Sequence, residues 1–360
     1  MKKILLIFGS RPEAVKLCPL IRELKSRPGF QVRVCVTGQH RQLLDSVLES
    51  FGVVPDWDLS VMQSQQTLAD LNQRVLQGLQ PVLEAEKPDL VLVQGDTTTA
   101  FAGALASFYR KLPVGHIEAG LRTFDVYSPY PEEFNRRAIS LMAQVHFAPT
   151  ETARDNLLRE GVPAGQIYVT GNTGVDALRQ SVREDFSHPV LDWAGENKLV
   201  VLTLHRRENW GQPMENALRA VRRVLAENAS VRVFSPVHPN PVVSRVIRAH
   251  LGDDPHVLLT EPLSIQQFHN VLARCALVLT DSGGIQEETT ALGKPTLVLR
   301  NTTERPEGLS AGVLELTGLE EESVYRAFSQ LLQREDTCLP QDTFGDGNAS
   351  RRIADILEKL

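Results

Sequence analysis

Several side chains that could bind an anion or move a proton follow short apolar stretches of the sequence. The segment 281–284, DSGG, comes directly after the apolar stretch 277–280 and before a helical pattern. A glycine turn at the start of a helix favours anion binding, because its backbone N–H groups are free and the helix dipole points toward the anion. The sequence therefore predicts a phosphate-type site at 281–284, with Glu287 and Glu288 on the helix that follows.

Three carboxylates are candidates for proton transfer. Asp96 follows a glycine after an apolar stretch, although it could also cap the helix that begins there. Glu118 ends an otherwise apolar stretch. Burying a carboxylate at the end of a strand costs free energy, which indicates a partner or a function for this side chain. Glu132 opens a helix after prolines, where acidic residues usually interact with the helix dipole. Carboxylates grouped around one site are suited to general acid–base catalysis.

Basic and imidazole side chains occupy similar positions. Arg11 and Lys16 flank a helix start after the first apolar stretch, although a plain helix cap also explains that pattern. His205 and Arg206 follow one predicted strand, and His238 follows the next. A lone histidine is more often a structural residue, but two histidines at successive strand ends favour a ligand site.

Motifs of several common enzyme classes are absent from the sequence. It contains no GxGxxG after a strand, no GxxxxGK[ST] loop, no GxSxG elbow and no HExxH or Cys/His cluster. We therefore expect no dinucleotide, P-loop or serine-hydrolase chemistry, and neither a metal ion nor another cofactor. An anion site, basic groups and carboxylates together suit a phosphate-bearing ligand whose other portion undergoes acid–base chemistry.

The composition of the chain bears on nucleic-acid binding, on membrane insertion and on the cellular compartment of the protein. The net charge of −6 argues against a general nucleic-acid binder, and Arg136-Arg137, like the other arginine pairs, is interpreted as a solvated helix face. No apolar segment approaches the roughly 18 residues of a membrane span. The four cysteines lack CxxC spacing, which favours free thiols in a reducing cytoplasm.

Short apolar stretches alternate with amphipathic helical patterns along nearly the whole chain. Strands that are apolar throughout and separated by helices predict parallel sheets covered on both faces. The predicted strands are residues 4–8, 32–36, 90–93, 114–117 and 145–147 and, after a polar stretch at 187–198, residues 199–204, 231–234, 257–259, 277–280 and 296–299.

This restart of the pattern predicts two doubly wound α/β domains that face each other across a cleft. Ligands bind at the carboxyl ends of the strands in such sheets, which is where most of the candidate side chains fall. The first domain is expected to span residues 1–171 and to regain the last helix at 346–360, and the second to span 172–345.

A series of segments along the chain closely resembles, in order, the non-hydrolysing UDP-N-acetylglucosamine 2-epimerases. The segments are GSRPEAVKLCPL, QHRQLLD, QGDTTTAFAGALASFY, PVGHIEAGLRTFDVYSPYPEEFNRR, TGNTGVDAL, HRREN, PVHPNP, LTDSGGIQEE, LGKPTLVLRNTTERPEG and FGDGNASRRI. The resemblance implies two Rossmann-like domains of glycosyltransferase B or glycogen phosphorylase-like architecture. It also implies the interconversion of UDP-N-acetylglucosamine (UDP-GlcNAc) and UDP-N-acetylmannosamine (UDP-ManNAc).

The resemblance implies roles for individual residues. The matched catalytic positions are Asp96, Glu118, Glu132 and His205, of which the first three are acid–base carboxylates. The matched substrate-binding positions are Arg11, Lys16, Phe268, Ser282, Gly283, Gly284, Glu288 and Arg305. The glycine turn would hold phosphate, Glu288 the ribose and Phe268 the uracil. Glu287 faces about 100° away from Glu288 around the helix and is expected to be structural.

Bacterial family members can bind a second UDP-GlcNAc as an activator beside the active site, and family members are commonly homodimers. The positions that match the activator pocket are Gln39, Gln42, Gln66, Arg206 and His238, with Glu132 shared between the two sites. The sequence has Gln65 where the family has an arginine.

The implied reaction begins at the anomeric C–O bond, because the proton at carbon 2 of the sugar is too weakly acidic for direct abstraction. UDP leaves, a carboxylate removes the acidified proton, and 2-acetamidoglucal forms. UDP then adds back with protonation from the opposite face, which requires acid–base groups on both faces. The alternatives are a UDP-sugar-dependent glycosyltransferase of the same fold, a hydrolysing epimerase and an inert UDP-sugar-binding regulator.

Overall fold

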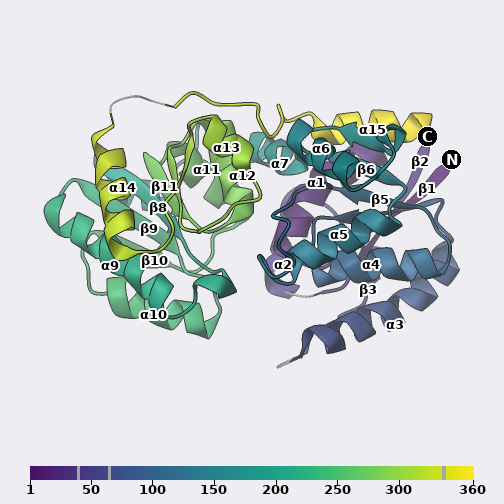
Figure 1. Cartoon of the computed structure of the whole chain (residues 1–360), viewed down its shortest axis with the longest axis horizontal. Helices are drawn as coiled ribbons and strands as arrows, with labels where there is room; N and C mark the ends of the chain where they lie inside the picture. Colours follow the sequence, from purple (N-terminus) through teal and green to yellow (C-terminus); the bar gives the residue numbers. More distant parts are fainter. Residues whose placement is uncertain (39–40, 64–65, 335–337) are drawn as a thin grey trace. The chain divides into compact units, whose positions relative to one another are not determined.

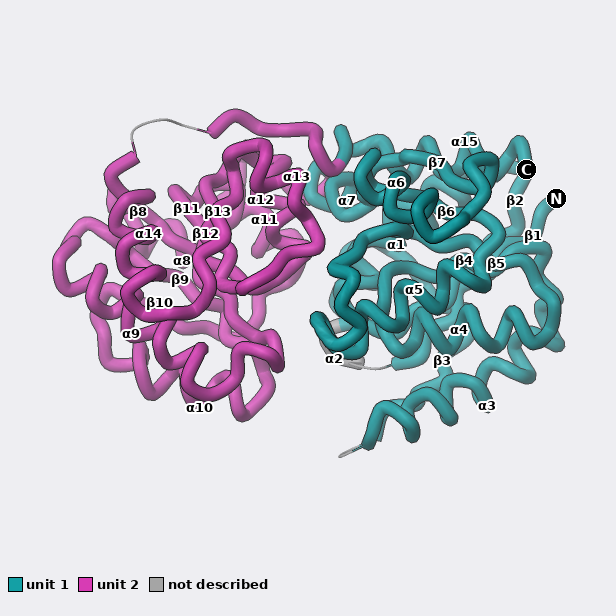
Figure 2. Tube along the Cα trace, in the orientation of Figure 1, with its two compact units in different colours: residues 1–179, 345–360 teal, residues 180–344 magenta. Residues whose placement is uncertain are grey.

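The computed structural model describes the chain in four stretches, residues 1–38, 41–63, 66–334 and 338–360 (Figure 1). The chain forms two compact units, which Figure 2 distinguishes by colour: unit 1 comprises residues 1–179 and 345–360, and unit 2 comprises residues 180–344. Each unit contains its own parallel sheet with interleaved helices. The predicted fold class, two Rossmann-like α/β domains, is thereby confirmed.

The compact units divide later in the chain than the expected boundary at residue 171. The helix α7 (Thr173–Ser181) is grouped mostly with unit 1. Its Asp176 carboxylate accepts hydrogen bonds from the backbone N–H groups of Ala349 (3.0 Å) and Ser350 (2.7 Å), at the start of α15 (Ala349–Lys359). The two helices are therefore held together, and both belong to the first unit.

The described part of unit 1 contains a sheet of seven parallel strands in the order β3-β2-β1-β4-β5-β6-β7. The strands are β1 (Lys2–Phe8), β2 (Phe30–Val36), β3 (Trp57–Asp58), β4 (Leu90–Gln94), β5 (Val114–Ile117), β6 (Val145–Ala148) and β7 (Ile167–Val169). Besides α7 and α15, the helices are α1 (Arg11–Lys25), α2 (Arg41–Phe51), α3 (Leu68–Glu86), α4 (Thr98–Tyr109), α5 (Glu132–Met142), α6 (Glu151–Arg159) and the short 3₁₀ helix η1 (Ala164–Gln166). The strand order reverses between β1 and β4, and ligands bind beside such a switch point.

The strands of unit 1 are apolar throughout because both faces of the sheet are covered. Leu5, Ile7, Val91 and Val93 form one core layer with side chains of α3, α4 and α5. The helix α15 packs against α1, so the C-terminal segment completes unit 1 (Figure 1). The strand β3 was not predicted, because two residues show no periodicity.

The helix α3 illustrates how amphipathic helices cover the sheet. Its buried Leu71, Val75, Leu79 and Val82 recur every three or four residues, so they lie on one face of the helix.

No helix in the four described stretches has the length and apolar character needed to cross a membrane.

The described part of unit 2 contains a sheet of six parallel strands in the order β10-β9-β8-β11-β12-β13. The strands are β8 (Lys198–Thr203), β9 (Val231–Pro236), β10 (Val257–Thr260), β11 (Leu277–Thr280), β12 (Thr296–Val298) and β13 (Leu314–Leu316). The helices are α8 (Pro189–Ala194), η2 (Arg207–Asn209), α9 (Gln212–Glu227), α10 (Pro241–Leu251), α11 (Ile265–Arg274), α12 (Gly283–Leu292), α13 (Pro306–Ser310) and α14 (Glu321–Gln333). Here the order reverses between β8 and β11.

Four short elements of unit 2 were not predicted, namely α8, η2, α13 and β13. The helix α8 lies inside the polar stretch 187–198, where Val190 and Ala194 are buried and the ring of His188 accepts a hydrogen bond from the Val190 N–H group (3.3 Å). The strand β13 has only three residues. All four elements are too short to produce a recognisable period.

Candidate functional site

The loop after β1 and the turn after β4 are joined by the buried carboxylate of Glu13. One oxygen of Glu13 accepts hydrogen bonds from the backbone N–H groups of Gly9 (3.1 Å) and Ser10 (2.7 Å), and the other accepts from the Thr97 hydroxyl (2.8 Å). Burial raises the pKa of Glu13 although these hydrogen bonds oppose the rise. Glu13 thus fixes the start of α1, where Arg11 lies partly exposed, against the turn that carries Asp96.

Asp96 lies just beyond β4 and is held by two residues of α5. Its carboxylate pairs with the guanidinium of the buried Arg136, with Nε at 3.1 Å and a closer contact to Nη2. The side-chain amide of Asn135 donates to the backbone carbonyl of Asp96 (2.8 Å). Asp96 remains partly exposed, so it is a fixed carboxylate that can still meet a ligand.

Glu118 lies beyond β5 with its backbone in the left-handed region, at φ +65°. Non-glycine residues in this region cost about 1–3 kcal/mol, and such strain clusters at functional sites. Its carboxylate pairs closely with the Lys16 ammonium group and accepts a hydrogen bond from Asn172 (2.8 Å). A Cβ atom at Gly95 would lie 3.8 Å from the Glu118 carboxylate, so the turn that carries Asp96 is next to Glu118.

The two acids at the start of α5 differ in their surroundings. Glu133 is fully buried, accepts hydrogen bonds from the backbone N–H groups of Thr123 (3.1 Å) and Phe124 (3.0 Å), and pairs with Arg136 (3.0 Å). Glu132, the first residue of α5, is partly exposed. Glu133 is therefore structural, and Glu132 is the member of the pair that is open to a ligand.

In unit 2, the fully buried Asp281 organises the loop after β8. Its carboxylate accepts hydrogen bonds from the backbone N–H groups of His205 (3.0 Å) and Arg206 (2.9 Å) and from the Asn209 side chain (3.0 Å). Burial opposes ionisation of Asp281, but the His205 charge and these hydrogen bonds outweigh it and lower its pKa to about 2. His205 Nδ1 lies 3.1 Å from the same carboxylate, which leaves Nε2 of this partly exposed ring as the nitrogen for a ligand.

The positions matched to an activator pocket are divided between the units. In unit 2 the ring of His238 stacks on that of His205, with centroids 5.6 Å apart, and Arg206 follows His205. In unit 1 Gln66 accepts a hydrogen bond from the Gln63 N–H group (3.1 Å). Gln39 and Gln65 lie outside the described residues, and the side chain of Gln42, within α2, is not described either.

The glycine turn of residues 282–284 forms the start of α12 beside a buried arginine. A Cβ atom at Gly283 would lie 2.5 Å from the Arg305 guanidinium, so only glycine permits this approach. Arg305 pairs with two buried acids, Glu287 at 2.6 Å and Glu304 at 2.7 Å. The first N–H groups of α12 and this guanidinium together give the turn a positive character that suits an anion.

Phe268 and Glu288 lie on the packed helices α11 and α12. Phe268 is buried, and the Glu288 carboxylate lies 3.5 Å from Nε2 of the fully buried His269. Glu287 and Glu288 therefore point to different partners, as expected for neighbours on a helix. In the described part of the chain, no three His, Cys, Asp or Glu side chains are grouped as metal ligands.

Several residues that build the site were not singled out from the sequence. They are Glu13, Arg136 and Asn172. The interpretation of Arg136 as part of a solvated pair was wrong, because α5 turns this side chain toward Asp96. Asp281 was included in the predicted anion site at 281–284, but its fully buried carboxylate holds the loop of His205 instead.

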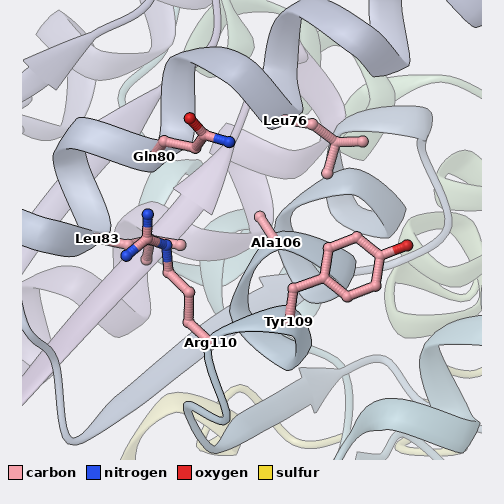
Figure 3. Close-up of a pocket in the computed structure, with 6 residues that line it drawn as sticks. All are labelled: Leu76, Gln80, Leu83, Ala106, Tyr109 and Arg110. Atoms are coloured by element: carbon pink, nitrogen blue, oxygen red, sulfur yellow. The ribbon is translucent and has the colours of Figure 1, made fainter.

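A cavity of about 210 Å³ lies elsewhere in unit 1, between α3 and α4. Figure 3 shows the residues that line it, which are Leu76, Gln80, Leu83, Ala106, Tyr109 and Arg110. Asp96 precedes the N-terminus of α4, whereas the cavity lies at its C-terminal end. A helix of that length spans about 18 Å, so the cavity is separate from the carboxylate site.

Comparison with a family model and with known proteins points to the same family. The family model described as UDP-N-acetylglucosamine 2-epimerase matches residues 22–358. The chain is 52% identical over 359 residues to the UDP-N-acetylglucosamine 2-epimerase of Bacillus subtilis (strain 168), which covers 99% of this chain and 94% of that protein.

Solved structures agree with this match over the full chain. The S. aureus MnaA–UDP structure has a TM-score of 0.97 and 44% identity, covering 100% of this chain and 96% of that one. The Neisseria meningitidis UDP-GlcNAc 2-epimerase bound to UDP-GlcNAc has a TM-score of 0.95 and 42% identity, covering 99% and 100%. The chain therefore belongs to the UDP-N-acetylglucosamine 2-epimerase family.

Proposed function

We propose that this epimerase interconverts UDP-GlcNAc and UDP-ManNAc without hydrolysis, by eliminating UDP and adding it back. The observation that carries the proposal is the adjacency of Glu118 and the Asp96 turn, with each carboxylate held by its own cation. The related N. meningitidis enzyme binds UDP-GlcNAc, which supports the same substrate here.

The proposed chemistry proceeds in two reversible halves. The anomeric C–O bond breaks and UDP leaves with the electron pair, so the sugar gains oxocarbenium character and its carbon 2 proton becomes acidic. A carboxylate takes that proton, which gives neutral 2-acetamidoglucal. Return of UDP to carbon 1 and of a proton to the opposite face of carbon 2 gives the epimer.

The acid–base roles fall to unit 1. Asp96, Glu118 and Glu132 supply the carboxylates, because inversion needs a base on one face of the sugar and an acid on the other. Lys16 and Arg11 lie at the start of α1 and add positive charge for the departing diphosphate. Fixed groups of this kind stabilise developing charge without reorganising during the reaction.

The nucleotide is assigned to unit 2. Its phosphates lie on the turn 282–284 over Arg305, its ribose hydroxyls donate to Glu288, and its uracil lies beside Phe268. His205, held through Nδ1 by Asp281, presents Nε2 to the diphosphate. The S. aureus relative was solved with UDP, which fits a site that retains the leaving group.

Incubation in heavy water tests this function. Purified protein with UDP-GlcNAc alone is expected to form UDP-ManNAc that carries deuterium at carbon 2, as followed by NMR. Epimer without deuterium, or no epimer, contradicts the proposal. Free N-acetylmannosamine indicates a hydrolysing enzyme, and turnover only with an added sugar acceptor indicates a glycosyltransferase.

Regulation by a second UDP-GlcNAc is a further part of the proposal. Its support is the stacking of His238 on the catalytic His205, which would let a ligand at His238 influence the reaction centre. With UDP-ManNAc as substrate, a trace of UDP-GlcNAc is expected to raise the initial rate. An initial rate that is independent of added UDP-GlcNAc contradicts this activation.

We also propose a cytoplasmic homodimer. The exposed side chains of Phe108, Tyr109 and Leu141 lie on α4 and α5, which pack against each other, and a second subunit would cover them. All four cysteines are free thiols, as suits a reducing compartment. Light scattering is expected to give the mass of two chains, and Leu141→Glu to reduce it. A monomeric wild-type protein contradicts the dimer.

A further inference from the structure

The fully buried His116 lies beneath the turn that carries Asp96. It belongs to β5, and its register partner on β4 is Val93. Its Nε2 atom lies 2.7 Å from the backbone carbonyl oxygen of Gly95. That carbonyl belongs to the peptide group that joins Gly95 to Asp96, so His116 contacts the backbone of the acid–base residue.

The direction of this hydrogen bond follows from the charge of the ring. Burial, aided by neighbouring His146 and Arg122, lowers the pKa of His116 to about 3, so the imidazole is neutral near pH 7. A neutral imidazole carries one N–H group, and a carbonyl oxygen only accepts. Nδ1 has no hydrogen-bond partner among the described residues, so the hydrogen is placed on Nε2.

The Gly95–Asp96 peptide needs such a partner because of its glycine. Gly95 has φ +68°, and glycine occupies positive and negative φ almost equally, so this peptide can rotate at low cost. The Gly95 N–H group is bound to the Ile117 carbonyl (2.9 Å), and Asn135 binds the carbonyl of Asp96. Neither bond reaches the Gly95 carbonyl. Among these contacts, the bond from His116 is the one that restrains the Gly95 carbonyl.

We propose that His116 is a positioning residue for Asp96, which holds the Gly95–Asp96 peptide so that the carboxylate stays on Arg136 and beside Glu118. The inference rests on the proposed acid–base role of Asp96. Rotation of this peptide would displace the carboxylate, and a misplacement of about 1 Å can cost about 10²-fold in rate.

Two substitutions of similar size isolate the hydrogen bond. His116→Met fills the site without a donor, and kcat is expected to fall by about 10- to 100-fold with KM and UDP affinity little changed. His116→Gln offers an amide N–H group to the same carbonyl and is expected to recover most of kcat. Calorimetric titration with UDP gives the fraction of binding-competent protein, and kcat is normalised to that fraction.

His146→Met is the matched control. His146 is equally buried, is the register partner of His116 on β6, and shows no hydrogen bond to the Gly95 turn in the described part of unit 1. Its replacement is expected to lower the melting temperature as much as His116→Met does while leaving kcat near the wild-type value. Equal losses of kcat in the two variants, or a Gln variant as slow as the Met variant, overturn the proposal.

A double-mutant cycle separates positioning from general damage. In an Asp96→Asn background, His116→Met is expected to cost no further activity, because the group it positions is already disabled. Additive losses overturn the proposal. Failure of Asp96→Asn itself to slow the enzyme would instead contradict the role proposed for Asp96, so the two failures are distinguishable.

Discussion

The two units hold their charged side chains in opposite ways. In unit 1 two carboxylates that we propose as acid–base groups are held by cations, whereas in unit 2 two basic groups that we propose to bind the nucleotide are held by buried carboxylates. The pairs are Asp96 with Arg136 and Glu118 with Lys16 in unit 1, and His205 with Asp281 and Arg305 with Glu287 in unit 2.

The proposed function uses this difference by placing proton transfer in unit 1 and nucleotide binding in unit 2. A carboxylate held by a fixed cation stays in place as an acid–base group, and unit 1 presents carboxylates where a proton must move. A basic group held by a buried carboxylate keeps its orientation toward an anion, and unit 2 presents such groups where UDP must be retained. Substitutions in unit 1 should therefore affect kcat most, and those in unit 2 should affect nucleotide binding most.

The largest effect is expected from neutralising the carboxylates of unit 1. Asp96→Asn, Glu118→Gln and Glu132→Gln should each lower kcat by about 10²–10⁴-fold, the usual contribution of a general acid or base. UDP affinity should change little, because these groups act on the sugar. Steady-state kinetics and UDP titration check both parts, and an unaltered kcat in any variant removes that residue from the mechanism.

A smaller effect is expected from removing a cation of unit 1. Lys16→Met removes the ammonium group that pairs with Glu118 and keeps the hydrogen bond from Asn172, so the Glu118 carboxylate is less well fixed. We expect kcat to fall by about 10- to 100-fold. Lys16→Arg, which keeps the charge, is the control and should retain more activity. Equal rates in the Met variant and the wild type would show that Lys16 does not hold Glu118.

A still smaller effect, and on a different quantity, is expected in unit 2. Glu287→Gln keeps an acceptor for Arg305 but removes the opposing charge, so the guanidinium beneath the glycine turn is less well fixed. The dissociation constant for UDP should rise by about 10-fold, as expected for weakening one charged hydrogen bond. Calorimetric titration measures this dissociation constant. A large fall in kcat with unchanged UDP affinity would reverse the assignment of the two units.

The units should also differ in the pH range over which they lose stability. The pKa values of the buried His116 and His146 are lowered from 6.5 to about 3 and about 4, chiefly by burial. The unfolded chain therefore takes up protons below pH 6.5 that the folded chain does not, and stability falls as the pH falls from 6.5. For Asp281, with a pKa lowered from 3.8 to about 2, stability is lost only below about pH 4.

Urea unfolding between pH 7 and pH 5 measures this difference. Each histidine contributes a slope of at most about 1.4 kcal/mol per pH unit to the free energy of unfolding. His146→Met should therefore make the profile shallower in this range. Parallel profiles for the wild type and His146→Met would contradict the burial of a neutral histidine in unit 1.

The sequence was sufficient for the fold, and it singled out the side chains that we propose to meet the ligand. Strands apolar throughout, separated by amphipathic helices, indicated parallel sheets without any tertiary information. The side chains just beyond those strands, among them Asp96, Glu118 and His205, were identified because polar groups at strand ends stand out against apolar stretches. Resemblance to the family then supplied the substrate.

The residues that hold those groups were harder to predict because they come from distant parts of the chain. Arg136 and Arg137 are adjacent in the sequence, and no local pattern distinguishes them. Only the packing of α5 shows that Arg136 turns inward while Arg137 stays partly exposed. Glu13 resembled an ordinary capping residue, and its bond to Thr97 depends on how β1 and β4 pair. Such contacts are set by tertiary packing rather than by local pattern.

The most direct test of the proposed elimination and re-addition of UDP follows the oxygen atom that joins the sugar to the diphosphate. UDP-GlcNAc labelled with ¹⁸O at this bridging position is incubated with the enzyme and recovered, and ³¹P NMR locates the label. Because we propose that the C–O bond breaks while unit 2 retains UDP, the label should move into the non-bridging positions of the β-phosphate. Epimerisation with the label still wholly in the bridge would contradict the account.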